Sequence, residues 1–123
     1  MRCLLVVAHG SRRAASNEEV VCLVEKLASK VSAQFDRTMA AFLELAEPSI
    51  VDGVDRLVEQ GATEIIVFPY FLAAGKHIAK DIPEEIAIAT KKHPSVSIHV
   101  TSYLGASEGL VDHMDSFLSA QLA

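Results

Sequence analysis

The chain has 123 residues, of which half are hydrophobic and 22% are charged, and its formal net charge is −5. This length suits one domain over residues 1–123 without a second, and the acidic balance argues against a nucleic-acid partner. No apolar run approaches the roughly 18 residues that would span a bilayer, and the N-terminal segment lacks the features of a signal peptide. We therefore expect a cytoplasmic protein that does not act on a membrane.

Four apolar runs of strand length alternate with four amphipathic helix patterns along the chain. We expect the first helix to begin at Ser16, because Ser16 and Glu19 form a capping-box pair. Pro48 suits the first turn of the second helix, and Gly61 suits its C-cap. The strands are expected at residues 3–7, 38–45, 64–70 and 96–100, the third helix at about 81–92, and the fourth helix around the apolar residues Leu110, Val111, Met114, Phe117 and Leu118.

A strand and helix that repeat every 30 residues or so are typical of a parallel sheet with helices on both faces. Right-handed crossovers favour a flavodoxin-like α/β fold with four parallel strands in the order 2-1-3-4. Strands one and three are then central, and the chain winds in opposite senses on either side of them. Ligands of open α/β sheets bind at this switch point, outside the carboxyl ends of the strands.

The loops at the switch point hold two histidines, His9 and His77. Either ring alone could bond a loop carbonyl, but together they favour a shared site for a divalent metal such as cobalt, nickel, iron or zinc. Glu44 ends the second expected strand in apolar surroundings, where a carboxylate is costly to bury unless it is paired. It is either a metal ligand or proton acceptor, or a local partner of Arg12. The other histidines are expected to be structural or solvated: His93, His99 and His113.

Basic side chains flank both loops, and they would suit a ligand rich in carboxylates or phosphates: Arg12, Arg13, Lys76 and Lys80. Neither the G-x-G-x-x-G pattern nor the Walker pattern of nucleotide sites is present. Cys3 and Cys22 form no C-x-x-C pair, so both are expected to be buried reduced thiols.

Three segments resemble the short-form sirohydrochlorin cobaltochelatases of the class II chelatase family. They are His-Gly-Ser-Arg at 9–12, Leu-Glu-Leu-x-x-Pro at 43–48, and Pro-Tyr-Phe-Leu-x-x-Gly-x-His-x-x-x-Asp-Ile-Pro at 69–83. The resemblance covers nearly the whole chain. It implies a lyase that inserts a divalent metal, cobalt before nickel or iron, into sirohydrochlorin without ATP, in cobalamin or tetrapyrrole biosynthesis. The metal is then a substrate, with no permanently bound cofactor, and the metal-binding and catalytic residues are His9, Glu44 and His77.

The resemblance also implies a homodimer that holds the tetrapyrrole between its subunits. Tyr70, Phe71 and Leu72 are then expected to line the flat ring, while Ser11, Arg12 and Lys76 bind its periphery. Unlike some members, this chain has no histidine-rich tail that would point to a particular metal. Two alternatives stay open: nickel or iron insertion into the same substrate, and a metal or tetrapyrrole carrier without turnover.

Overall fold

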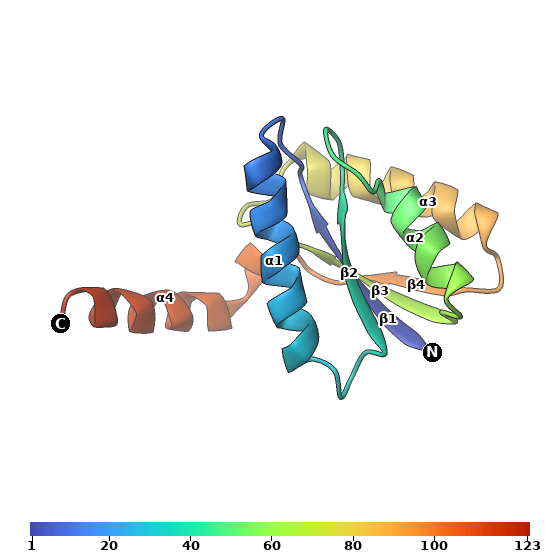
Figure 1. Cartoon of the computed structure of the whole chain (residues 1–123). Helices are drawn as coiled ribbons and strands as arrows, with labels where there is room; N and C mark the ends of the chain where they lie inside the picture. The colour runs from blue at the N-terminus through green and yellow to red at the C-terminus, as the bar shows by residue number, and fades with distance from the viewer.

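One parallel sheet with strand order β2-β1-β3-β4 forms the centre of the computed structural model, which describes residues 1–123 (Figure 1). On β1, Leu5 pairs with Met39 on one side and with Val67 on the other. The predicted flavodoxin-like order, with β1 and β3 in the middle, is therefore confirmed. The strands are β1 (Arg2–Ala8), β2 (Arg37–Phe42), β3 (Glu64–Pro69) and β4 (Ser97–Val100).

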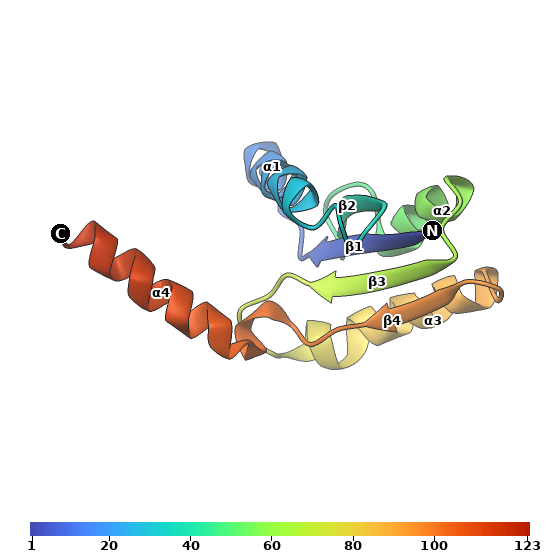
Figure 2. The same cartoon turned by 90° about the horizontal axis from the view of Figure 1, so that it is seen from below.

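The helices lie on both faces of this sheet, as expected. Leu4 and Val6 of β1 point toward α1 (Ala14–Lys30), whereas Leu5 and Val7 point toward α2 (Ile50–Glu59) and α3 (Ile82–Lys92). The near-continuous apolar run of β1 follows from this two-sided burial. A fourth helix, α4 (Glu108–Gln121), extends away from the sheet (Figures 1 and 2). None of the helices has both the length and the apolar character that crossing a membrane requires.

The capping box predicted at Ser16 is wrong, because α1 begins two residues earlier, at Ala14. The turn before the helix is fixed instead by Asn17, whose side chain accepts from the Ser11 N–H at 2.9 Å and donates to the Ser11 carbonyl at 2.8 Å. The Arg13 N–H also donates to the Ser11 hydroxyl. A side chain on the second turn of the helix therefore sets where the helix starts.

The second strand and helix also differ from the prediction. Strand β2 ends at Phe42, and Pro48 precedes α2 rather than lying in its first turn. The N-cap is Ser49, whose hydroxyl accepts from the Asp52 N–H at 3.1 Å. Gly61 follows the helix with a φ of +105°, as a glycine at a helix C-terminus commonly does.

The other differences are small. The fourth strand begins at Ser97, one residue later than expected, and α3 ends at Lys92 as predicted. Cys3 is buried, but Cys22 lies exposed on α1, so the expectation of two buried thiols is wrong for Cys22. Burial raises the pKa of the Cys3 thiol, which therefore stays neutral at physiological pH.

Asp55 ties α2 to the end of α3, and this contact predicts a pH-dependent contribution to stability. Its carboxylate accepts from His93 Nε2 at 2.7 Å and from Lys92 Nζ at 2.6 Å. The bond from His93, and then that from Lys92, lowers the pKa of the Asp55 carboxyl. Because the pKa is lower in the folded state, the stabilisation is present above the unfolded-state pKa and is lost as the pH falls through the folded-state value.

We therefore expect Asp55→Asn to lower the free energy of unfolding by about 1 kcal/mol at neutral pH. The difference from the unmodified protein should shrink toward zero at strongly acidic pH. Urea unfolding at both pH values measures it, with Asp112→Asn on the exposed α4 as the control. An equal loss of stability at both pH values would contradict an ionic contribution.

Candidate metal centre

The loops that follow β1 and β2 are joined through their backbones, and this contact sets His9 beside Glu44. The Leu43 N–H donates to the Ala8 carbonyl at 2.9 Å, and the Glu44 N–H donates to the His9 carbonyl at 3.0 Å. Gly10 has a φ of +96°, and a Cβ at this position would lie 1.8 Å from the Glu44 carbonyl oxygen. Only glycine therefore allows the two loops to approach this closely.

Glu44 lies two residues beyond the end of β2, and its side chain is about half exposed, at 54%. The expectation of an apolar setting is wrong, because Phe42 and Leu43 pack into the core while Glu44 turns toward His9. Its partner is His9 rather than Arg12: Glu44 Oε1 lies 2.8 Å from His9 Nε2.

This short contact is not aligned as a hydrogen bond. His9 Nε2 is shielded from solvent and has no hydrogen-bond partner, although the Glu44 oxygen is close to it. Two ligand atoms that share one ion, each about 2.1 Å from it, lie about 3.0 to 3.4 Å apart and point at the ion rather than at each other. The His9–Glu44 pair is slightly closer than this and has the misalignment of two such ligands.

His77 does not lie in a loop, as the sequence suggested, but begins a π-helical turn, η1 (His77–Asp81), that continues directly into α3. The Ile82 N–H donates to the His77 carbonyl and closes this wide turn. Single π turns of this kind are rare and are often found at functional sites. The turn sets Asp81 Oδ2 at 2.8 Å from His77 Nδ1, so the Nε2 atom of this ring is the one available to a ligand.

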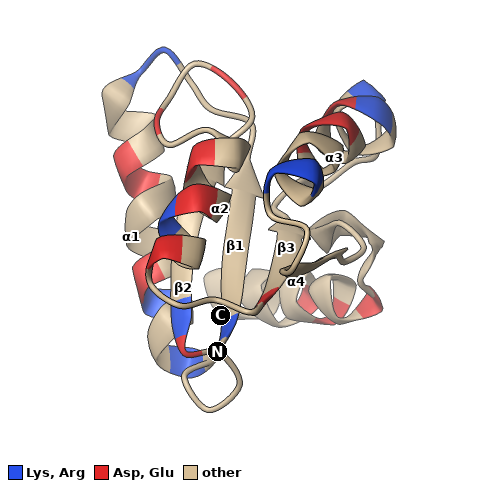
Figure 3. Ribbon diagram, turned by 90° about the vertical axis from the view of Figure 1, so that its right-hand side faces the viewer, with Lys and Arg blue, Asp and Glu red and all other residues tan.

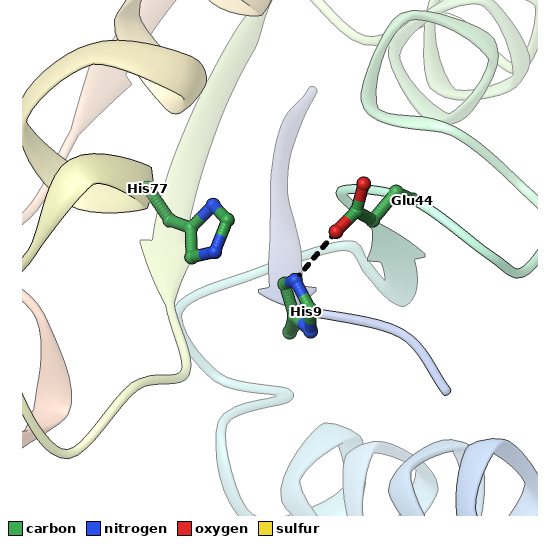
Figure 4. A group of neighbouring side chains, drawn as sticks. All are labelled: His9, Glu44 and His77. Atoms are coloured by element: carbon green, nitrogen blue, oxygen red, sulfur yellow. Dashed lines mark ion pairs between the residues drawn. The ribbon is translucent and has the colours of Figure 1, made fainter. Parts of the chain in front are cut away.

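The three side chains converge on one small volume, with His9 between His77 and Glu44 (Figure 4). The ring centroids of His9 and His77 are 4.5 Å apart, and the ligand atoms of all three residues lie within 4.8 Å of one another. Ligand atoms on one ion are at most about 4.2 Å apart. A small rotation of a half-exposed imidazole closes the difference, so these residues can share a divalent ion.

The residues expected to bind substrate are spread around this centre. Phe71 lies beside His77, with their ring centroids 6.4 Å apart, and Leu72 is 70% exposed. Tyr70 instead points to the other face of the sheet, where it packs near Val6 and α1. The Ser11 hydroxyl accepts a hydrogen bond within its own turn.

The expected basic residues are exposed at the same edge of the sheet: Arg12 and Arg13 on the loop before α1, Lys76 just before η1, and Lys80 within it. Figure 3 shows the basic tip of the loop between β1 and α1, and the acidic ribbon on the loop after β2. The metal centre thus lies between loops of opposite charge.

Asp81 is the site residue that sequence reasoning missed. The third helix begins near Asp81 as expected, but the Asp81 side chain forms no capping bond and bonds His77 instead. The four-residue spacing between the histidine and the aspartate is the signal that could have revealed it, because residues four apart face each other on a helix.

Comparisons with known proteins agree with this architecture. A family model described as CbiX matches residues 3–120. The crystal structure of a putative cobalamin (vitamin B12) biosynthesis CbiX protein from Marinobacter aquaeolei VT8 is similar over 99% of this chain and 98% of that one, with a TM-score of 0.82 and 32% identity.

Two curated proteins are also similar. The sirohydrochlorin cobaltochelatase of Sulfolobus acidocaldarius is 33% identical over 109 residues, which cover 89% of this chain and 83% of that protein. The sirohydrochlorin ferrochelatase of Bacillus subtilis is 36% identical over 110 residues, but these cover only 41% of its length. The chain therefore spans less than half of the ferrochelatases that it matches.

Proposed function

This chain belongs to the CbiX family, and from this premise we propose that it is a chelatase that inserts a divalent metal ion into sirohydrochlorin. The observation that carries the proposal is the convergence of His9, Glu44 and His77 at the carboxyl edge of the two central strands. That edge is where open α/β sheets bind their ligands. The names of the similar proteins, sirohydrochlorin cobaltochelatase and ferrochelatase, support the substrate.

The ligand set suits a metal that must be released into a product. Two imidazoles and one carboxylate leave coordination positions open for the nitrogens of the incoming macrocycle, whereas a closed four-ligand site would retain its ion. The side chains are 40 to 54% exposed, so a flat ring can approach them from solvent. His9 and His77 would hold the metal, and Glu44 would complete the ligand set or accept a pyrrole proton.

The surrounding residues are proposed to bind the tetrapyrrole. Phe71 lies near His77 and Leu72 is exposed next to it in the chain, so both can contact the ring. Arg12 and Lys76 are exposed where they can pair with the peripheral carboxylates. We also propose that Ser11 and Tyr70 lie at the rim of the binding site. Ser11 fixes the loop after β1, and Tyr70 directly precedes Phe71.

Cobalt is proposed as the metal, with nickel and iron as alternatives on the same substrate. Imidazole and carboxylate ligands accept all three ions, and availability selects among them more than geometry does. An anaerobic absorbance assay of sirohydrochlorin with each ion in turn tests the proposal. We expect multiple turnovers above the uncatalysed rate, fastest with cobalt. A carrier would instead yield at most one equivalent of metallated product, and that outcome would reject the enzymatic reading.

We further propose that residues 1–123 fold as a single domain, that the protein acts in the cytoplasm, and that it works as a homodimer around its substrate. The half-exposed side chains of the metal centre support the dimer, because a second copy can cover a ring bound against them. Sedimentation of the intact chain measures the assembly state, and a fully active monomer would contradict the shared cavity.

Glu44→Gln should lower the rate of metal insertion by about 10-fold or more, because the amide keeps the shape but loses the charge that binds metal or accepts a proton. Glu47→Gln is the matched control, since Glu47 is an exposed carboxylate on the same loop without an ionic partner. It should stay within about twofold of the unmodified rate. Initial rates with cobalt compare the two, and the opposite ranking would mean that Glu47 is the functional carboxylate.

Asp81→Asn should weaken cobalt binding by about 10-fold, because the carboxylate that orients His77 through Nδ1 is replaced by an amide. Calorimetric titration of the protein with cobalt alone measures this without the tetrapyrrole. Glu84→Gln, at an exposed position of α3, is the control. Equal cobalt affinity in both variants would mean that Asp81 does not position the ring.

A further inference from the structure

Helix α4 carries an apolar stripe that nothing in the chain covers. None of its residues is buried, and the exposed fractions of Val111, Phe117 and Leu118 are 60%, 54% and 55%. Leu110 and Met114 lie on the same stripe by helical spacing, while Ser116 lies opposite. The helix extends away from the sheet (Figure 2). A helix patterned in this way ordinarily buries its stripe against another element.

An apolar groove beside α1 is likewise uncovered. It has a volume of about 210 Å³, and all of its lining residues are hydrophobic. Leu23 at its edge is 46% exposed, and Phe68 and Tyr70 contribute the surface of β3. We call this the α1 groove, and its lining is Val6, Leu23, Val24, Leu27, Phe68, Tyr70 and Leu104.

The topology explains why the groove is open. Helices α2 and α3 cover the opposite face of the sheet, and α1 packs over β1 and β2 on this face. No strand follows α4, so no crossover fixes its place, and it is the one helix not already packed on a face of the sheet. The chain therefore contains one unpaired helix and one unpaired groove of matching character.

The turn before α4 directs the helix away from the groove of its own chain. This turn, η2 (Leu104–Ala106), is held by a hydrogen bond of 3.0 Å from the Gly105 N–H to the Phe71 carbonyl. A Cβ on Gly105 would lie 1.7 Å from the Leu72 carbonyl oxygen, so the turn packs directly against the loop after β3. Leu104 of the same turn lines the edge of the groove.

We propose that two copies of this chain exchange their α4 helices, each packing its apolar stripe into the α1 groove of the other. The exchange is reciprocal, so a two-fold dimer leaves neither stripe nor groove exposed. The 14 residues of α4 extend for about 21 Å. The charges are also compatible: α4 carries Glu108, Asp112 and Asp115 but no lysine or arginine, and the rim of the groove beside Leu23 holds Lys26 together with Glu19.

This inference rests on the uncovered surfaces and does not depend on the chelatase activity. It has a consequence for the metal centre all the same. Tyr70 lines the groove and is followed directly by Phe71, which lies beside His77. The partner's helix would therefore pack against the base of the loop that carries the site.

Sedimentation velocity tests the proposal with one pair of variants on each surface. Phe117→Asp on the stripe and Leu23→Asp on the groove should each turn a dimer into a monomer, because a charge cannot be buried there without a partner. Ser116→Asp and Val21→Asp are the matched controls, on the polar side of α4 and on the other side of α1, and both should remain dimeric. Circular dichroism and urea unfolding establish that all four variants fold.

A mixture of the Phe117→Asp and Leu23→Asp proteins distinguishes exchange from other dimers. One intact stripe then meets one intact groove, so the mixture should recover dimers that neither variant forms alone. As a second measurement, the double variant Phe117→Cys/Leu23→Cys should form a disulfide between the two chains under mild oxidation, because Phe117 lies on the stripe and Leu23 lines the groove. A monomeric unmodified protein, dimers that survive both charge variants, or a disulfide found only within one chain would each overturn the proposal. Insertion activity is not used as a readout, so these outcomes are independent of the proposed metal insertion.

Discussion

His77→Ala is expected to reduce metal insertion more than about 100-fold, because it removes one of only three side chains that converge on the ion. The His77 side chain is 40% exposed and none of the η1 residues is buried, so the loss should not unfold the protein. The measurements are the initial rate with cobalt and sirohydrochlorin, the affinity for cobalt alone, and the melting temperature. The first two should decrease strongly while the third stays nearly constant.

His99→Ala is the matched control for this experiment. His99 is an exposed histidine on β4 whose ring bonds only the hydroxyl of Ser97, and it takes no part in the metal centre. Its replacement should leave both the rate and the affinity for cobalt unchanged. Near-normal insertion by His77→Ala would reject the assignment of this ring as a metal ligand. An equal loss in the two variants would point to a general effect of removing imidazoles.

Gly10→Ala is expected to have the largest effect on the structure itself. The backbone at Gly10 has a φ of +96°, which an alanine adopts only with strain, and its Cβ would meet the Glu44 carbonyl oxygen at 1.8 Å. The two loops must then separate, which breaks the bond from the Glu44 N–H to the His9 carbonyl and moves Glu44 away from His9. We expect a loss of about 2 kcal/mol or more in the free energy of unfolding, together with loss of insertion.

Gly75→Ala provides a matched control close to the same site. A Cβ at Gly75 meets no atom within 4 Å, and its backbone is not in the left-handed region. Urea unfolding of this variant should therefore match the unmodified protein within about 0.5 kcal/mol. A Gly10→Ala protein as stable and as active as Gly75→Ala would mean that the loops after β1 and β2 do not need to touch.

The arrangement of the sheet and the location of the site could be predicted from the sequence. Apolar runs of strand length and right-handed crossovers leave few topologies, and the order with β1 and β3 at the centre follows from them. Parallel strands end at one edge, so His9 and His77, which follow those two strands, had to come close together. Their ring centroids are 4.5 Å apart.

Other features of the site depend on contacts between segments far apart in the sequence, which local patterns do not report. Residues 43–45 continue an apolar run, so the sequence predicts that they extend the second strand. Their backbone instead leaves β2 and forms hydrogen bonds with the loop after β1, and Glu44 therefore faces His9. The π turn that joins His77 to Asp81 leads directly into α3, so the sequence predicts a helix starting near Asp81 but not the bond from the Asp81 side chain to His77.

The sequence by itself determined what each element is and which edge of the sheet holds the metal centre, because periodicity and chain connectivity are local properties. Only the tertiary structure decided how the third ligand is aimed and where α4 points. Both depend on close approaches between distant backbones, Gly10 against Glu44 and Gly105 against Leu72. Steric exclusion at such contacts has no periodic pattern in the sequence, and so it becomes visible only when the chain is folded.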